Sequence, residues 1–72
     1  MPNDYIEVKV GKLPGRVETI ALNGERTVEA ALEGAELDSE GYELRANGEE
    51  ADFDTELKDG DTVLLVRKIK GN

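Results

Sequence analysis

The side chains of this 72-residue chain that could do chemistry are almost all carboxylates. Asp52, Asp54 and Glu56 stand at alternate positions, as the first oxygen ligands of a calcium-binding loop do. That loop pattern needs glycine one place after the third ligand, and Leu57 occupies this position. We therefore interpret the three acids as solvated loop side chains and predict no metal site.

A pair of carboxylates could also act as acid and base in glycoside hydrolysis, and Glu49 and Glu50 lie near Asp52 in the sequence. A chain this short has no room for a sugar cleft between two walls. It contains no histidine and no cysteine, so the usual neutral-pH base, the usual zinc ligands and a thiol nucleophile are missing. We predict that the protein is not an enzyme, with no catalytic residue and no cofactor.

Charge is distributed unevenly along the chain. The net charge of -8 argues against nucleic-acid binding, which needs a clustered lysine and arginine surface. Residues 25–56 hold twelve acids against two arginines, whereas Arg67, Lys68 and Lys70 follow the last acid, Asp61. This pattern predicts an acidic body with a basic end. The charge either keeps the surface solvated and the protein soluble, or it produces an electric field that steers a binding partner.

The sequence carries no sign of a membrane segment or an export signal. No run approaches the roughly 20 apolar residues of a membrane span, and the first residues lack the basic and apolar regions of a signal peptide. The absence of cysteine fits a reducing compartment. We expect a cytoplasmic monomer that does not bind membranes.

The first part of the chain has the pattern of a β-hairpin. Residues 5–10 alternate apolar and polar side chains, as a half-buried strand does. Pro14-Gly15 then predicts a reversal, and residues 17–22 resume an extended pattern. The inward side chains of the two strands are aliphatic: Ile6, Val8, Val10, Ile20 and Leu22.

A short amphipathic helix is predicted over residues 28–35. Thr27 offers a hydroxyl as the N-cap, and Glu29 lies in the first turn, where the helix dipole favours an acid. The apolar residues recur with helical spacing at Val28, Ala31, Leu32 and Ala35. At barely two turns, this helix depends on packing against a sheet.

The last part of the chain predicts three more strands. Residues 42–46 alternate, Asn47-Gly48 is a strong hairpin signal, and a brief strand follows near residues 50–51. Phe53 and Leu57 are the expected apolar anchors of the next connection, and residues 58–61 form a turn. Residues 63–66 are four consecutive large aliphatics, which indicates a strand in the middle of the sheet.

These elements predict an α+β fold in the order ββαββ(β). The first and last strands are the most apolar, so we place them side by side and parallel at the sheet centre, with the helix as a right-handed crossover. The result is a β-grasp, a mixed four- to five-stranded sheet with one short helix. Residues 1–72 form a single domain, and residues 68–72 form a flexible C-terminal tail.

Three motifs carry a resemblance to a known family: Thr27-Val28-Glu29-Ala30-Ala31-Leu32 opening a helix, Asn47-Gly48-Glu49 at a hairpin, and Leu57-Lys58-Asp59-Gly60-Asp61 before a strand ending Lys68-Ile69-Lys70-Gly71. Together they resemble the small sulfur-carrier proteins of thiamine and molybdopterin biosynthesis, which have the ubiquitin-like β-grasp fold. The resemblance covers about residues 6–71.

The resemblance implies chemistry at the C-terminus. In those carriers the chain ends in two glycines, and an adenylating activating enzyme modifies the terminal carboxylate before sulfur is added. Gly71 matches the first glycine, whereas Asn72 stands where the second is found. These two residues are the candidate conjugation-like tail.

The resemblance to ubiquitin-like proteins also implies an apolar binding patch on the sheet face away from the helix. If Val63 and Leu65 point toward the helix, Leu13, Leu64 and Val66 supply this patch. We expect it to be smaller than that of ubiquitin, because the polar Glu43 and Arg45 must turn Tyr42 and Leu44 toward the core. The basic end provides the other candidate partner-binding residues: Arg67, Lys68, Ile69 and Lys70.

Two functions remain open at this point. One is a non-catalytic ubiquitin-like module that binds a protein partner, with the apolar patch at the centre and the basic tail at the rim. The other is a sulfur carrier or protein modifier that is activated at its own carboxylate. The tail itself also has two interpretations, because Ile69 could instead close the bottom of the core and the three basic residues could protect a sheet edge.

Overall fold

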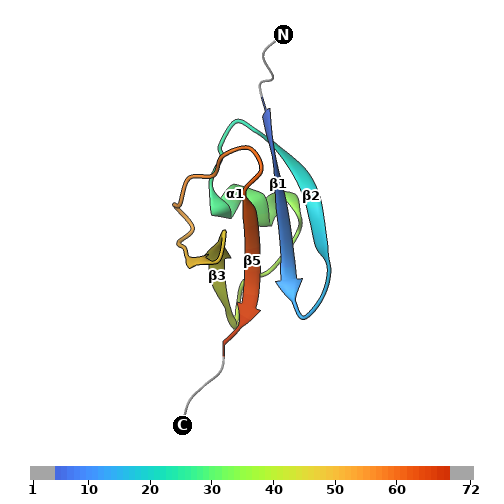
Figure 1. The fold of residues 1–72 in the computed structure, drawn as a ribbon, viewed down its shortest axis with the longest axis vertical. Helices are drawn as coiled ribbons and strands as arrows, with labels where there is room; N and C mark the ends of the chain where they lie inside the picture. The colour runs from blue at the N-terminus through green and yellow to red at the C-terminus, as the bar shows by residue number, and fades with distance from the viewer. Residues whose placement is uncertain (1–4, 69–72) are drawn as a thin grey trace.

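The structure is a computed structural model, and it describes residues 5–68. Six elements follow one another along the described chain: β1 (Tyr5–Leu13), β2 (Val17–Asn23), α1 (Val28–Gly34), β3 (Tyr42–Ala46), β4 (Glu49–Glu50) and β5 (Thr62–Arg67). Figure 1 shows the helix lying across one side of the strands. The predicted element order is therefore confirmed.

The five strands form one mixed sheet in the order β2-β1-β5-β3-β4. β1 and β5 are parallel neighbours at its centre, and the other pairs are antiparallel (Figure 1). This arrangement confirms the predicted central pairing and the α+β β-grasp fold. β1 runs beyond the predicted end at Val10, because its pairing with β5 continues as far as Leu13, which lies opposite Val66.

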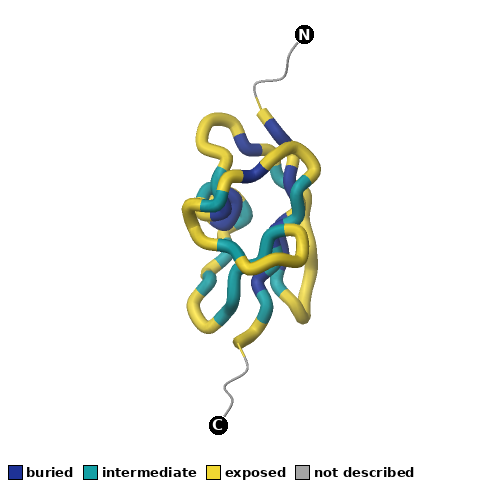
Figure 2. Tube along the Cα trace, turned by 60° about the vertical axis from the view of Figure 1, so that its left-hand side comes forward, coloured by how far each residue is buried: buried dark blue, intermediate teal, exposed yellow. Residues whose placement is uncertain are grey.

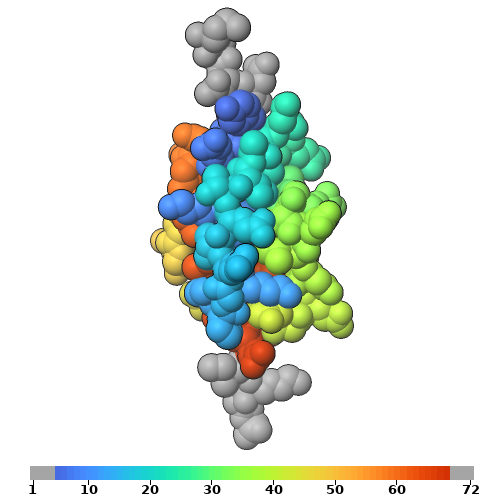
Figure 3. Space-filling view, turned by 90° about the vertical axis from the view of Figure 1, so that its right-hand side faces the viewer, coloured from blue at the N-terminus to red at the C-terminus, as the bar shows by residue number. Residues whose placement is uncertain are grey.

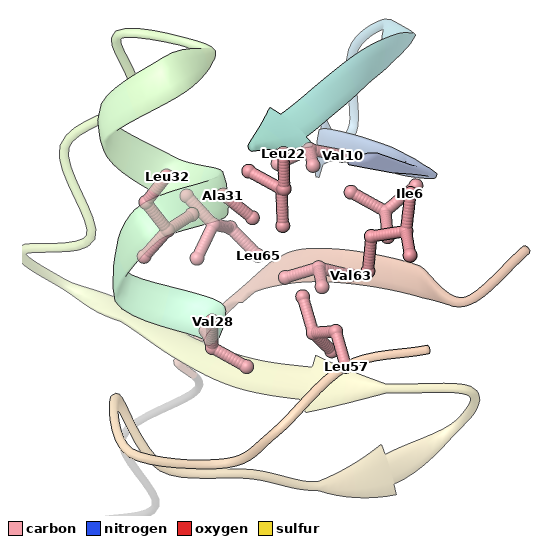
Figure 4. Packing of buried hydrophobic residues seen from close by; sticks show 10 residues of the cluster. Ile6, Val10, Leu22, Val28, Ala31, Leu32, Leu57, Val63 and Leu65 are labelled. Carbon is pink, nitrogen blue, oxygen red and sulfur yellow. The ribbon is translucent and has the colours of Figure 1, made fainter. Parts of the chain in front are cut away.

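The hydrophobic core lies between the sheet and α1. Ten apolar side chains of the described residues are buried there: Ile6, Val8, Val10, Leu22, Val28, Ala31, Leu32, Leu57, Val63 and Leu65. Figure 4 shows side chains from the strands and from the helix pointing toward one another. Full burial of one such aliphatic side chain contributes about 1.5–3 kcal/mol, so this layer holds a helix that is too short to be stable alone. In Figure 2 the turns around this core are mostly exposed.

The N-terminus of α1 is capped as its sequence indicates. The Thr27 hydroxyl accepts a hydrogen bond from the Ala30 amide at 3.2 Å, which confirms the predicted N-cap. The Val28 amide donates to the Thr55 carbonyl at 3.0 Å, and the Glu29 amide donates to the Phe53 carbonyl at 3.1 Å. These bonds satisfy helix amides that have no partner within the helix.

The same bonds explain why one predicted anchor is wrong. The side chain of Phe53 is 47% exposed, although we expected it to anchor the connection in the core. Its carbonyl turns inward to the helix amide of Glu29, and Asp52 and Thr55 close a tight turn around it. Leu57, the other predicted anchor, is buried and confirmed.

The turn of residues 58–61 is fastened to its own backbone and to β1. Asp61 Oδ2 accepts from the Lys58 amide at 2.8 Å, which closes the turn. Asp59 Oδ1 accepts from the Glu7 amide at 2.9 Å, and the Gly60 amide donates to the Glu7 carbonyl at 2.7 Å. The acids in this turn therefore have a structural role, since they hold the entry of β5 against β1.

Within residues 5–68, the structure contains no helix with the length and apolar character needed to cross a membrane.

Candidate interaction face

The residues of β5 alternate between the two faces of the sheet. Val63 and Leu65 are fully buried beneath α1. Since successive strand side chains point to opposite faces, Leu64 and Val66 lie on the face that the helix does not cover. We call this the open face. The structure thus agrees with the predicted strand orientation, and both side chains are half-buried there.

Leu13 joins them from the neighbouring strand. It lies opposite Val66 in the parallel β1–β5 register and is 38% exposed. Its position also follows from the alternation in β1, where Val8 and Val10 are buried on the helix side. The structure therefore brings Leu13, Leu64 and Val66 together on the open face.

A fourth apolar side chain on this face was missed by the sequence analysis. Val17 at the start of β2 is 45% exposed and lies opposite Gly11, which in turn lies opposite Leu64. A signal was present, because inward-facing Ile20 requires the odd-numbered residues of β2 to face outward. The open-face patch is defined from here on as Leu13, Val17, Leu64 and Val66.

Gly11 allows β2 to approach the middle of this patch closely. A Cβ atom at Gly11 would lie 2.7 Å from Val17 Cα and 2.8 Å from Val17 Cγ2, closer than real side chains come. It would also collide with the carbonyl oxygen of Arg16. The absence of a side chain at Gly11 thus lets the Val17 side chain lie over β1 and continue the patch.

Polar residues on β3 end the patch on one side. Glu43 lies opposite Val66, and Arg45 lies opposite Leu64. Arg45 Nη2 and Glu43 Oε1 form an ion pair at 3.1 Å, with 39% of each side chain exposed. Because this pair stands where more apolar surface could lie, the patch is confined to β1, β2 and β5.

The core side of β3 agrees with the sequence analysis. Leu44 lies opposite Leu65, and both Tyr42 and Leu44 pack against the core. The Lys12 ammonium lies 5.0 Å from the centre of the Tyr42 ring, on the same side of the sheet. This distance allows a cation–π interaction, which closes the core at the end of β1.

The basic end of β5 is divided between the two faces. Arg67 lies opposite Tyr42, so strand alternation places it on the helix side and not at the rim of the patch, where we expected it. Lys68 follows the strand, and its amide donates to the Gly41 carbonyl at 3.2 Å. Ile69, Lys70, Gly71 and Asn72 lie outside the described residues, so their predicted roles stay predictions.

The described residues contain no group of three histidine, cysteine, aspartate or glutamate side chains placed to hold a metal ion. In the described part of the chain, Asp61 is the carboxylate with a clear pKa shift, because hydrogen bonds from the Asn47 side chain and the Lys58 amide lower its pKa. These are structural bonds at a turn.

A shallow hollow at the other end of the open face is lined by residues of β1, β2 and the 58–61 turn: Glu7, Val8, Lys9, Thr19, Asp59 and Gly60.

Comparison with solved structures defines the class of fold. The chain resembles a de novo design based on ubiquitin, with a TM-score of 0.66, 24% sequence identity, and coverage of 97% of this chain and 96% of that one. It also resembles a ubiquitin-like protein from Trypanosoma brucei, with a TM-score of 0.66, 18% identity, and coverage of 94% and 100%. The protein therefore has a ubiquitin-like β-grasp fold. No family model and no curated protein matches the sequence.

Proposed function

We propose that the protein is a small, non-catalytic ubiquitin-like module that binds a protein partner through the open-face patch. The observation that carries this proposal is the uncovered cluster of Leu13, Val17, Leu64 and Val66, on the sheet face opposite α1. Contiguous apolar surface rimmed by polar residues is characteristic of protein interaction sites. Four aliphatic side chains make a small patch, so the contact belongs to the transient class of interfaces.

The rim indicates the chemistry of the partner. Glu43 and Arg45 offset each other as an ion pair, whereas Lys9 lies on the open face beside Thr19. Lys68 follows the strand at the other end of the patch. A partner that presents apolar side chains flanked by carboxylates would therefore match both the centre and the two ends of this surface.

To test the proposal, a protein partner is captured on the immobilised wild-type protein. Its affinity for the wild type and for two variants is then measured by calorimetric titration. The test variant is Leu13→Ser with Val17→Thr, which removes apolar surface from two exposed positions. Phe53→Ser is the matched control, because Phe53 is equally exposed but lies in the loop attached to α1. We expect the double variant to weaken binding roughly tenfold or more, as for residues at an interface centre, and the control to bind as the wild type does. Equal binding by all three proteins would exclude the patch.

The second candidate function is a sulfur carrier or protein modifier. It is favoured by the turn motif of residues 57–61 leading into β5 and by Gly71 near the C-terminus. Incubation with ATP and an adenylating activating enzyme, followed by intact-mass measurement, tests this function. A terminal adenylate or thiocarboxylate would support the carrier function. An unchanged mass would count against it and favour the binding module.

We also propose that the protein acts as a cytoplasmic monomer. Its net charge of -8 disfavours self-association, and the absence of cysteine fits a reducing compartment. Sedimentation equilibrium at increasing protein concentration tests the monomer.

A further inference from the structure

Among the described residues 5–68, β2 forms an unpaired edge of the sheet. It is seven residues long and has β1 as its one neighbour in the strand order. Figure 3 looks onto this side of the molecule and shows the surface of β2 uncovered, with α1 beside it. The other edge strand, β4, has two residues. The long free edge of this sheet is therefore β2.

The hydrogen-bond register identifies the backbone groups that face outward. The Lys12 amide donates to the Arg16 carbonyl at 3.3 Å, which marks these opposed residues as a hydrogen-bonded pair. Opposed residues in an antiparallel ladder alternate between bonded and non-bonded pairs, so every second residue of β2 bonds to β1. The remaining residues direct their N–H and C=O groups away from the sheet: Val17, Thr19, Ala21 and Asn23.

This edge has little of the usual protection against strand addition. Natural edge strands are commonly blocked by proline, by lysine, by a bulge, by an inward-pointing charge or by being very short. β2 contains neither proline nor lysine, and Glu18 is its one charged residue. Glu18 has the same parity as Ile20 and Leu22, so its side chain lies on the helix side. An inward-pointing carboxylate disfavours an uncharged or acidic added strand, whereas a cationic strand would offset its charge.

The charge around the edge indicates what kind of strand it would accept. Residues 16–41 carry seven acids and two basic residues, Arg16 and Arg26. Glu18 lies on β2, and the exposed Glu29 and Glu33 belong to α1, which packs against β2. A second copy of this chain would bring the same acids with it and be repelled, whereas a cationic segment would be attracted.

We propose that the free edge of β2 binds an extended, lysine- or arginine-flanked segment of a protein partner as a sixth strand. The outward backbone groups of β2 supply the hydrogen bonds, and the surrounding acids select for positive charge. This is a second interaction surface, because it uses the edge of the sheet and not the open face.

The probe is a synthetic peptide of alternating valine and threonine with two lysines at each end. Nuclear magnetic resonance of the labelled protein would follow every backbone amide during titration. We expect the amides of Thr19, Ala21 and Asn23 to shift and to become protected from hydrogen exchange. A peptide of the same composition with a central proline should bind weakly, because proline lacks the N–H donor.

Two variants separate the backbone and charge contributions. Thr19→Pro removes an outward donor that β1 does not use, and it should abolish the peptide-induced shifts while circular dichroism shows a folded protein. Glu18→Lys should weaken binding by roughly twofold to fivefold, as expected for one exposed charge pair. Glu49→Lys on β4 is the matched control, with the same change of net charge at the opposite edge, and should have less effect than Glu18→Lys.

Several results would overturn the proposal. One is that the peptide shifts the amides of Leu64 and Val66 while those of β2 stay unchanged, which would leave the open-face function intact. Another is equal affinity for a peptide with glutamates in place of the lysines. A third is a set of β2 shifts that grows with protein concentration in the absence of peptide, which would make a second copy the occupant. If Thr19→Pro fails to fold, the test is the wild-type protein alone: its Thr19, Ala21 and Asn23 amides must become protected from hydrogen exchange when the peptide binds.

Discussion

The side-chain amide of Asn47 donates a hydrogen bond to Asp61 Oδ1 at 3.0 Å. Asn47 Oδ1 in turn accepts from the Thr62 amide at 3.0 Å, and the Asn47 amide donates to the Thr62 carbonyl at 2.8 Å. One residue of the β3–β4 turn is therefore tied by three bonds to the start of β5. The hairpin turn and the acidic turn, which are separate motifs in the sequence, form one structural unit.

The first prediction concerns the pH dependence of stability through Asp61. Its pKa in the folded protein lies below the ordinary value of 3.8, because the Asn47 side chain and the Lys58 amide donate to the carboxylate. The stabilisation is therefore fully present above that ordinary value and is lost as the pH falls through the folded-state pKa. We expect Asp61→Asn to be less stable than the wild type at neutral pH and the difference to shrink in acid. Urea unfolding at a series of pH values measures this, and parallel stability curves would contradict it.

The second prediction concerns Asn47 itself. Asn47→Gly keeps a residue that adopts the positive φ of 55° easily, but it removes both side-chain hydrogen bonds. Since each bond contributes about 0.5–1.5 kcal/mol, we expect a loss of roughly 1–3 kcal/mol in the free energy of unfolding. Denaturant unfolding of the two proteins provides the measurement. An unchanged midpoint would show that water replaces the Asn47 side chain without cost.

The third prediction tests the two faces of β5. Leu65 is fully buried, whereas Leu64 lies half-exposed on the open face. Leu65→Ala should lower the free energy of unfolding by about 2–5 kcal/mol, and Leu64→Ala should cost much less. The denaturation midpoints of the two variants are directly comparable. The reverse order of midpoints would mean that the strand is inverted.

The fourth prediction contrasts two glycine-to-alanine changes. Gly11→Ala should be destabilising, because its Cβ would press against the backbone of Arg16 and Val17. At Gly34 a Cβ would meet the end of the flexible Ile20 side chain at 3.2 Å, and alanine gains about 1 kcal/mol over glycine in a helix. We expect Gly34→Ala to be neutral or stabilising by up to about 1 kcal/mol. Thermal unfolding compares the pair, and a stability gain in Gly11→Ala would refute the close approach of β2.

Most of the fold could be predicted because the periodic signals are strong. The alternation around Val8 and the aliphatic run at 63–66 indicated the two central strands, and the N-cap at Thr27 marked the start of the helix. These signals are local patterns of side-chain type, which can be identified directly in the sequence. The predicted helix ended at Ala35, one residue beyond the observed end at Gly34. Ala35 is the C-cap of the helix, and its amide donates to the Ala31 carbonyl in the last turn.

The errors arose where capping hydrogen bonds, strand alternation or strand register determine which way a side chain points. Phe53 was expected in the core on hydrophobicity alone, but its carbonyl caps the helix and its ring turns outward. Arg67 was grouped with Val66 by adjacency in the sequence, although neighbours in a strand face opposite sides. Val17 was overlooked because the predicted patch combined Leu13 with two residues of the last strand, whereas the pairing of Val17 with Gly11 extends the patch to β2.

The position of β1 between β2 and β5 has a consequence for biosynthesis. Its hairpin partner is synthesised within a few residues, but its other partner arrives much later, since Lys9 pairs with Thr62. During translation the β1 edge of the hairpin therefore lacks its partner β5, and the apolar face with Val8 and Val10 stays uncovered. The central strand pair therefore forms only after β5 has been synthesised, and this long-range pairing is expected to be a late step in folding.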